Sequence, residues 1–464
     1  LARAANRGSV STGPYEVANS LKTEPDNGER FVTGDIFTNY SSVRKFTVST
    51  WLKRTELGAQ SLVWFNVNTN TAVQLQFEAG DYLAIILQDN VGNGVESYSK
   101  TSALLRDTSA WYHVILAVDT TDGTAANRTK IYINGVNQTL VQGNGSYDTF
   151  PAQNYDAPLQ TRHYLLGYDG GNNGFRGYVA EYYFLDGITA SPTDLGEFDE
   201  DSGIWKPIEY TGGFGNEGYY MNFSDSANMG KDHGPNAQGN GFADPYGIAA
   251  ADQSTDTPTN NFATLNPLII HGANDYFVIT EGGTNIIQSG QVGWGTMTAN
   301  IAVNSGKWYA EIKSASTLIM IGNSQVDDPV TYSVAHLGQL ANTTSLGMGY
   351  YNSNGDIYRN AGNTGYGDAW DSGDIMGIAL EFKSDGTANM YVAENNVWKN
   401  SADPAAGTGG AALDYGNALP TGLHFTFAVA LHNNTGETEV NFGGFTTISI
   451  SSAASDANGY GTFE

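Results

Sequence analysis

The sequence of 464 residues contains no cysteine, and lysine and arginine are scarce, with 21 basic against 48 acidic residues. The absence of cysteine excludes disulfides, thiolate metal sites and thiol catalysis together. The formal net charge of −27 argues against a nucleic acid partner and against anionic membrane surfaces, because both attract clustered basic side chains. Long hydrophobic runs are also missing: residues 82–87 and 425–431 are among the longest, far short of the roughly 18 that predict a membrane span. No membrane insertion is expected.

Glycine and aromatic residues are abundant, with 57 Gly and 27 Tyr, a composition that favours many short strands joined by tight turns. Period-two alternation begins at residues 46–52 and predicts a strand with one buried face. Further strands are predicted at 73–77, 82–87, 111–119, 130–133, 164–167 and 177–185. The dipeptide Asn134-Gly135 predicts a hairpin, since both residues tolerate the positive φ of a type I′ turn.

One helical start is predicted at Ser191-Pro192-Thr193-Asp194, with Ser as N-cap and Pro at the first helical position. Composition then shifts to Gly, Asn, Asp and Pro, and strand patterning resumes in the second half. The sequence therefore predicts an all-β protein of two antiparallel β-sandwich (jelly-roll) domains. The expected boundaries are 1–30 for an N-terminal arm, 31–205 for the first sandwich, 206–270 for an ordered Gly/Asn/Pro-rich connector, 271–445 for the second sandwich and 446–464 for a C-terminal tail.

Four segments of the first half resemble the LamG, or concanavalin A-like lectin, fold: residues 46–54, 111–119, 130–135 and 177–186. The resemblance covers about 31–205. The second half resembles a SPRY domain through residues 305–312, 373–380 and 440–443, and this likeness covers about 271–445. Tyr391-Val-Ala-Glu-Asn-Asn396 departs from the Tyr-Lys-Asn-Gly hairpin that SPRY strands commonly carry. Both resemblances imply a concanavalin-like or SPRY-like sandwich.

The junction between the halves resembles structural proteins of marine bacteriophages, which join a LamG-like to a SPRY-like module. The residues that carry this resemblance are 184–187, 203–207, 219–223 and 255–267. It implies a virion component, a tail fibre or a capsid decoration, exposed on the virion surface outside the cell. The implied partners are other virion proteins and further copies of this chain in a symmetric homo-oligomer.

No catalytic constellation is predicted. Glycoside hydrolases of the concanavalin-like fold carry alternating carboxylates on one strand, and the nearest match is Glu197-Phe-Asp199-Glu-Asp201. It follows the helical turn, lies outside the apolar alternation and ends in Asp, so we expect a solvated loop. Gly213-Phe-Gly215-Asn-Glu-Gly218 matches a dinucleotide-binding pattern, but it precedes a strand where phosphate binding needs a helix. A non-enzymatic protein is expected.

No metal site is predicted from the seven scattered histidines, none of which forms a close pair with a third ligand. No cofactor is expected. Calcium alone is left open, because LamG-type domains can bind it through rim oxygens, and Asp169 lies in a Gly/Asn-rich loop.

The sequence predicts a ligand-binding site at Tyr358, Tyr366 and Trp370. Glycan recognition needs aromatic faces for sugar rings and planar polar groups for hydroxyls, and residues 350–371 have that composition. A structural role, with Trp370 plugging a sandwich edge, is the alternative. Adhesion to a host-surface glycan or protein is the expected function. Two alternatives stay open: a secreted carbohydrate-binding module or accessory protein of a glycan hydrolase, and a purely architectural virion protein.

Overall fold

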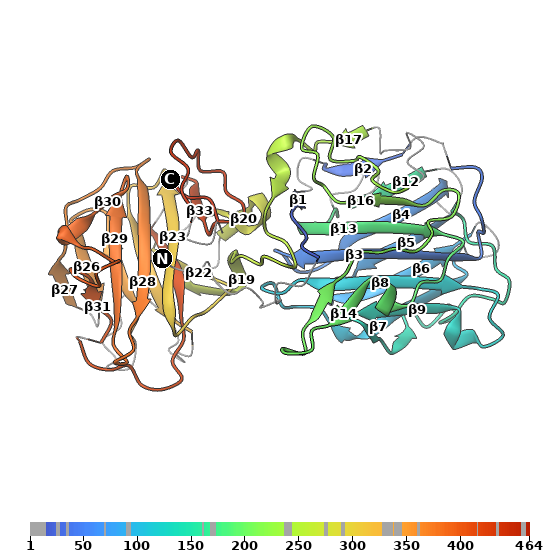
Figure 1. The fold of residues 1–464 in the computed structure, drawn as a ribbon, viewed down its shortest axis with the longest axis horizontal. Helices are drawn as coiled ribbons and strands as arrows, with labels where there is room; N and C mark the ends of the chain where they lie inside the picture. Colours follow the sequence, from blue (N-terminus) through green and yellow to red (C-terminus); the bar gives the residue numbers. More distant parts are fainter. Residues whose placement is uncertain are drawn as a thin grey trace. The chain divides into compact units, whose positions relative to one another are not determined.

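The computed structural model of the chain divides between Asn260 and Asn261 into two compact units (Figure 1). It describes residues 15–24, 28–33, 37–68, 71–89, 94–159, 162–167, 173–235, 244–272, 277–288, 293–326, 337, 346–359, 362–414, 416–432, 436–455 and 461–464. Within these ranges, helix is confined to single 3₁₀ turns: η2 (Ala125–Asn127), η3 (Pro192–Asp194), η4 (Ala250–Asp252), η5 (Glu281–Gly283) and η6 (Lys399–Ser401). None of these described helices has the length and apolar character to cross a membrane. The predicted all-β fold class is confirmed.

The first unit is built on two antiparallel sheets. In the described residues, the first sheet has the strand order β10-β9-β8-β3-β13-β1-β18, and β16 also pairs with β13. Its strands are β1 (Ser20–Thr23), β3 (Lys45–Arg54), β8 (Tyr112–Asp119), β9 (Thr129–Ile133), β10 (Val136–Asn137), β13 (Gly177–Asp186), β16 (Tyr219–Met221) and β18 (Gln253–Ser254). Asn134 and Gly135 join β9 to β10 with φ of 49° and 77°. The hairpin prediction is therefore confirmed.

The second sheet of this unit has the described order β11-β7-β6-β5-β4-β12-β2-β17. Its strands are β2 (Arg30–Val32), β4 (Gln60–Asn68), β5 (Thr71–Phe77), β6 (Tyr82–Gln88), β7 (Ser97–Leu104), β11 (Leu140–Gln142), β12 (Arg162–Leu165) and β17 (Asp244–Tyr246). Three strands of the expected connector, β16, β17 and β18, pair within the two sheets of this unit. Strand β1, from the expected arm, does the same.

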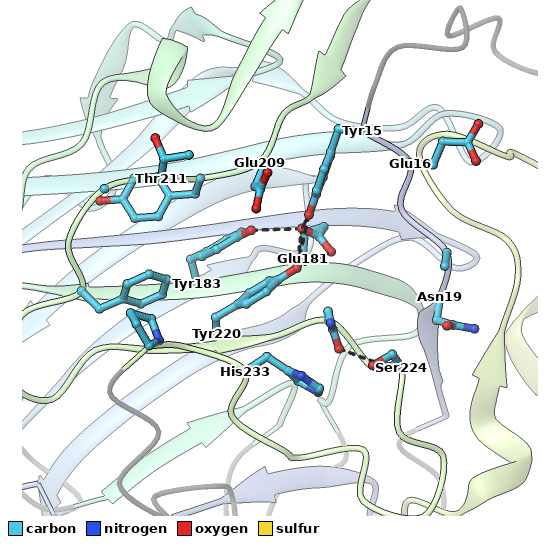
Figure 2. Close-up of a pocket in the computed structure, with 16 residues that line it drawn as sticks. Tyr15, Glu16, Asn19, Glu181, Tyr183, Glu209, Thr211, Tyr220, Ser224 and His233 are labelled. Atoms are coloured by element: carbon cyan, nitrogen blue, oxygen red, sulfur yellow. Dashed lines mark hydrogen bonds between the residues drawn. The ribbon is translucent and has the colours of Figure 1, made fainter.

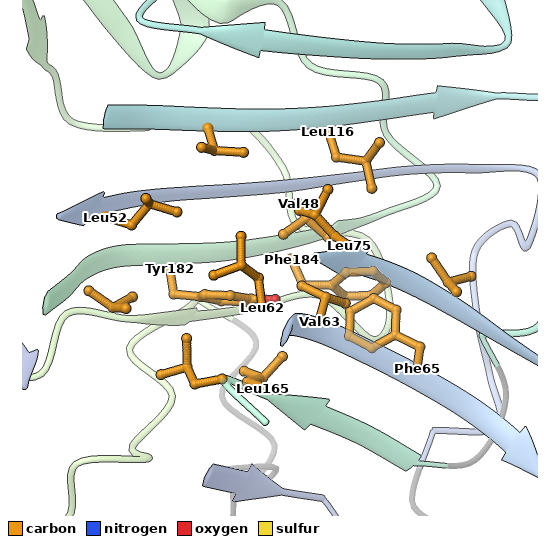
Figure 3. Packing of buried hydrophobic residues seen from close by; sticks show 14 of the residues in the cluster. Val48, Leu52, Leu62, Val63, Phe65, Leu75, Leu116, Leu165, Tyr182 and Phe184 are labelled. Atoms are coloured by element: carbon orange, nitrogen blue, oxygen red, sulfur yellow. The ribbon is translucent and has the colours of Figure 1, made fainter. Parts of the chain in front are cut away.

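The core of the first unit lies between the two sheets, as a sandwich requires (Figure 3). The side chains that face one another across the two sheets have an exposure near zero. Those drawn together include Val48, Leu52, Leu62, Val63, Phe65, Leu75, Leu116, Leu165, Tyr182 and Phe184. Each large apolar side chain buried in this way contributes about 1.5–3 kcal/mol by transfer from water.

The opposite face of the β3–β8–β13 sheet is also covered, although the alternation predicted only one buried face. Ile115, Tyr183 and Leu185 point away from the core and pack under Leu195 and Phe214. The cover includes η3 and the hairpin of β14 (Gly196–Phe198) and β15 (Trp205–Pro207). The backbone N–H of Ser191 donates to Oδ2 of Asp194 at 2.8 Å, so the predicted helical start is confirmed as one 3₁₀ turn.

Buried ion pairs fix further segments to this outer face. Nζ of Lys53 on β3 lies 2.7 Å from Oδ2 of Asp256, and both side chains are almost fully buried. Nε1 of Trp111 donates to the other oxygen of Asp256 at 3.0 Å. Lys22 on β1 pairs with Asp252 at 2.9 Å. Residues 250–257 are therefore an integral strap of the first sandwich.

The second unit is also a two-sheet sandwich. In its described part, one sheet has the order β19-β22-β32-β24-β25-β26-β27, and the other has β20-β21-β33-β23-β28-β29-β30 with β31 paired to β29. The first comprises β19 (Leu265–Gly272), β22 (Trp294–Ala299), β24 (Ile319–Gln325), β25 (Met348–Tyr351), β26 (Asp356–Arg359), β27 (Gly362–Gly365) and β32 (Phe425–His432). The second comprises β20 (Phe277–Thr280), β21 (Asn285–Gln288), β23 (Gly306–Ser314), β28 (Ile375–Phe382), β29 (Ala388–Glu394), β30 (Val397–Trp398), β31 (Ala411–Ala412) and β33 (Thr438–Asn441).

The core of the second unit contains side chains from both sheets, for example Ile321 and Val429 from one and Ile312 and Ile378 from the other. The segment that departs from the SPRY hairpin ends in a two-residue turn, because Glu394 pairs with Val397. The intervening Asn395 and Asn396 both have positive φ, 44° and 66°. Asparagine therefore serves here the role that glycine has in such turns.

Candidate functional site

A β-bulge in β13 places an acidic side chain on the outer face of the first sandwich. The pairing of β13 with β3 shifts register between Ala180 and Tyr183, and Glu181 has a φ of 51°. Such a backbone conformation is unfavourable for a residue with a side chain, and bulges of this kind often re-aim a side chain at a functional site.

On the side of β13 opposite β3, the bulge separates the residues that pair with β1 from those that pair with β16. Before it, β1 pairs with Gly177 to Val179; after it, β16 pairs with Tyr182 to Phe184. Glu181 therefore lies between the segment of β13 that pairs with β1 and the segment that pairs with β16. This geometry brings Tyr15, which precedes β1, and Tyr220 of β16 to the same carboxylate.

Three tyrosine hydroxyls donate to Glu181 (Figure 2). Tyr15 Oη lies 2.5 Å from Oε2, and Tyr183 Oη lies 3.0 Å from the same atom. Tyr220 Oη is 2.8 Å from each carboxylate oxygen. Burial raises the pKa of Glu181, and the hydroxyl donors oppose this by stabilising the charged form. Burial and then the charge of Glu181 raise the pKa of each tyrosine, so the hydroxyls remain neutral donors.

A cleft of about 640 Å³ opens above this network, and we call it the tyrosine cleft (Figure 2). One wall is aromatic: Tyr183 and Tyr220 stack with centroids 4.3 Å apart and planes 7° apart, and Tyr210 meets Tyr183 edge to face. The other lining groups are mainly polar. The residues that line it are Tyr15, Glu16, Ala18, Asn19, Glu181, Tyr183, Glu209, Tyr210, Thr211, Gly212, Phe214, Tyr220, Asn222, Ser224, His233 and Pro235.

This lining combines ring faces with amide, hydroxyl and carboxylate groups around a concave surface. Tyr210 and Tyr220 are only half-buried, and Asn19 and Asn222 are also accessible. Sugars need such a combination, because apolar ring faces pack on aromatic side chains while hydroxyls bond to planar polar groups. The cleft is therefore chemically suited to a polyhydroxylated ligand.

A serine–histidine pair under the outer face does not have the orientation of a nucleophile and its base. Nδ1 of His113 accepts from Nε1 of Trp205 at 2.9 Å, since an indole N–H can only donate. The proton of neutral His113 is therefore on Nε2, which donates to Ser49 Oγ at 2.8 Å. A general base would instead accept from the serine. Burial also lowers the pKa of His113 to about 3. The pair is structural.

The three residues predicted to bind a ligand lie in the second unit, where the structure does not bring them into one exposed group. Trp370 and Tyr366 belong to the core, with 3% and 9% exposure. Tyr358 is half-buried and packs edge to face on Tyr351, outside that core. Burial of Trp370 favours the alternative of a structural plug. Glycan binding at these three residues stays a prediction.

The acidic motif at residues 197–201 lies at a hairpin of the first unit. Glu197 and Asp199 lie on and just after β14, where both carboxylates pair with Lys206 at 3.2 and 3.3 Å. Asp199 also accepts from the backbone of Ser202. Asp169, the residue considered for calcium, lies outside the described residues. Among the residues described, no group of three metal-ligating side chains occurs.

One feature of the sequence points to the tyrosine cleft, although the alternation of apolar and polar residues does not explain it. Glu181 is the one acidic residue inside the apolar run 177–185, and it precedes two tyrosines. Tyr219-Tyr220 repeats that aromatic pair later in the chain. Charge within a buried strand indicates a partner, but two of the three partners here are 166 and 39 residues away.

Comparison with known proteins bears on the first unit. Residues 27–190 match the concanavalin A-like lectin/glucanases superfamily. The match covers most of the two sheets just described, so the first sandwich is concanavalin A-like in sequence and in architecture. No relative matches among curated proteins.

Solved structures similar to the chain include a human SPRY domain, with 19% identity over 36% of this chain and 96% of that domain and a TM-score of 0.27. The SPRY domain of human HERC1 has 15% identity over 40% of this chain and 99% of that domain, with a TM-score of 0.29. The sandwich architecture of the second unit rests on its own strand pairing.

Proposed function

We propose that the chain is a non-enzymatic recognition protein whose tyrosine cleft binds a glycan. The observation that carries this proposal is the cleft itself, in which stacked tyrosines and accessible amides surround a carboxylate that a bulge aims outward. The match of residues 27–190 to a superfamily that includes lectins supports a binding or adhesion module. The rigid sheets beneath would hold the aromatic wall in place before a ligand arrives.

The arrangement of Glu181 favours binding over glycoside hydrolysis. A hydrolase needs one carboxyl group free to protonate the leaving oxygen and a second at a defined separation. The donors to Glu181 are three hydroxyls of the protein, and the hydroxyl of Tyr220 is shared between the two carboxylate oxygens. The other carboxylates of the cleft, Glu16 and Glu209, are exposed side chains outside this network.

We further propose that the protein is displayed on the outer surface of a phage virion, as a tail fibre or capsid decoration. Support comes from the resemblance of residues 203–207, 219–223 and 255–267 to the junction of marine phage structural proteins. Symmetric assembly with other virion proteins would present many copies of the cleft, and multivalency strengthens adhesion when single sites are weak.

A glycan array followed by titration calorimetry tests the binding proposal. Tyr210→Ala removes an accessible ring from the cleft, and Asn222→Ala removes an amide; each is expected to weaken binding about tenfold or more. Tyr246→Ala, an exposed tyrosine on β17, is the matched control and should bind normally. The combined Tyr358, Tyr366 and Trp370 variant tests the site predicted from sequence. Unchanged binding by both cleft variants would refute the assignment of the cleft.

The virion proposal has a separate test. Particles from an infected culture are purified on a density gradient, and the fractions are probed for this chain by mass spectrometry. The chain should sediment with intact particles, and an antibody against the first sandwich should label their surface. Recovery only as a free protein at the top of the gradient would contradict a virion location.

A further inference from the structure

We infer that the glycan bound in the tyrosine cleft carries a protonated amine, as an amino sugar does. This inference rests on the proposed glycan-binding function and specifies its ligand. The first observation is the sign of the charge in the cleft. Glu16, Glu181 and Glu209 line it, and the described lining contains no lysine or arginine. Burial lowers the pKa of His233, which disfavours the charged form of that side chain.

The second observation concerns the partners of the other buried carboxylates in this unit. Several are paired with a cation: Asp256 with Lys53, Asp252 with Lys22, Asp81 with Arg54, Asp199 with Lys206 and Glu24 with Arg176. The remainder accept backbone N–H groups: Glu29, Asp186, Glu217 and Asp232. Among the described residues of this unit, Glu181 is the buried carboxylate whose partners are all side-chain hydroxyls.

Hydroxyls stabilise a carboxylate but carry no compensating charge. Glu181 is 4% exposed, so its charge is weakly screened by water, and it lies at the floor of an open cleft. A buried charge attracts an opposite charge more strongly than an exposed one does. The nearby Lys231 pairs with Asp225 at 3.2 Å and is not part of the lining. The missing positive charge is therefore expected from the ligand.

The tyrosine wall suits an ammonium group as well. Tyr183 is 5% exposed and stacks on Tyr220, so the ring open to a ligand is that of the half-buried Tyr220. A cation within about 6 Å of such an electron-rich ring is attracted to it. Sugar hydroxyls next to the amine can bond to Asn19, Asn222 and Thr211, which also line the cleft. Acidic sugars would place like charges together, which is unfavourable. The cleft is thus expected to prefer amino sugars to neutral sugars and to disfavour uronic or sialic acids.

Calorimetry with the full chain tests this selectivity, using a glucosamine hexamer and the fully N-acetylated hexamer at neutral pH. The free-amine hexamer should bind about tenfold tighter or better, and added salt should reduce that preference. Glu181→Gln keeps the shape of the side chain and should remove the preference for the free-amine hexamer. Glu209→Gln, at the exposed rim, gives a second variant with little risk to folding and should reduce the preference in part.

Glu200→Gln, exposed and outside the cleft, is the matched control for loss of one negative charge. Equal affinity for the two hexamers, with binding still lost in Tyr210→Ala, would overturn the amine inference and leave glycan binding intact. A preference that persists in both Glu181→Gln and Glu209→Gln would also overturn it. If neither hexamer nor any glycan of the array binds, the proposed function fails as well.

Discussion

The buried histidine of the outer face allows a quantitative prediction of how stability depends on pH. His113 lies fully buried between Trp51, whose ring is 4.6 Å away and nearly parallel, and the indole N–H of Trp205. Burial lowers its pKa from 6.5 to about 3. In the unfolded chain it takes up a proton below 6.5, while in the folded chain it stays neutral. Its contribution to stability is therefore complete above pH 6.5 and is lost as pH falls toward 3.

The magnitude follows from the interval over which only the unfolded chain is protonated. Between about pH 6.5 and about pH 4.5 this interval is about 2 pH units, which corresponds to about 2.7 kcal/mol. His113→Gln removes the titration. At about pH 7.5 the variant should be less stable than the wild type by about 1–3 kcal/mol, from lost packing and hydrogen bonds. At about pH 4.5 that difference should shrink by about 2.7 kcal/mol or reverse.

Urea unfolding at the two pH values measures this difference. Because the chain has two units, the transition to follow is the one that the variant shifts. Subtraction cancels every other titrating group, including Glu29, whose pKa burial raises to about 7. Ser49→Ala is the control, since it alters the same contact without a titrating group, and its effect should be equal at both pH values. A His113→Gln effect that does not change with pH would refute the argument.

Two further predictions concern packing in the first unit. Gly218→Ala would place a Cβ 1.9 Å from the carbonyl oxygen of Phe214, so we expect at least about 3 kcal/mol of destabilisation or failure to fold. Gly58→Ala, where φ is 97° but the space around the Cβ is open, should cost only about 1–2 kcal/mol. Calorimetric melting compares the stabilities of the two variants. Lys53→Met leaves Asp256 buried without its cation and should cost about 3–5 kcal/mol in urea unfolding, whereas adding Asp256→Asn should recover part of that loss; equal stability of the single and double variants would contradict this.

Much of the fold could be predicted because its signals are local. Alternation marked β3 and β13, Asn134-Gly135 marked a two-residue turn, and Ser191 marked a helical turn, and each prediction needs only a few neighbouring residues. The expected single buried face was incomplete for β3 and β13, since the hairpin of β14 and β15 and the strap at 250–257 cover the other face. Coverage by distant segments leaves no periodic signature in the covered strand.

The aromatic residues predicted to bind a ligand show that composition does not distinguish an exposed cluster from a buried one. Composition alone drew attention to Tyr358, Tyr366 and Trp370, because a cluster of rings and amides in a loop looks the same whether it faces solvent or core. The structure places Trp370 in the core of the second unit. Rings that remain accessible, Tyr210 and Tyr220, come from the segment whose Gly- and Asn-rich composition predicted an ordered connector.

The sequence by itself determined the class of the molecule: without cysteine, long apolar runs or clustered bases, and with short alternating strands, it could form little other than paired β-sheets. Only the tertiary structure decided which polar side chains lie together in the tyrosine cleft. A one-residue bulge in β13 turns Glu181 outward and parts β1 from β16, and that register places Tyr15, Tyr183 and Tyr220 on one carboxylate. Register between strands far apart in the chain is set by packing of the whole sheet, so no local pattern of residues encodes it.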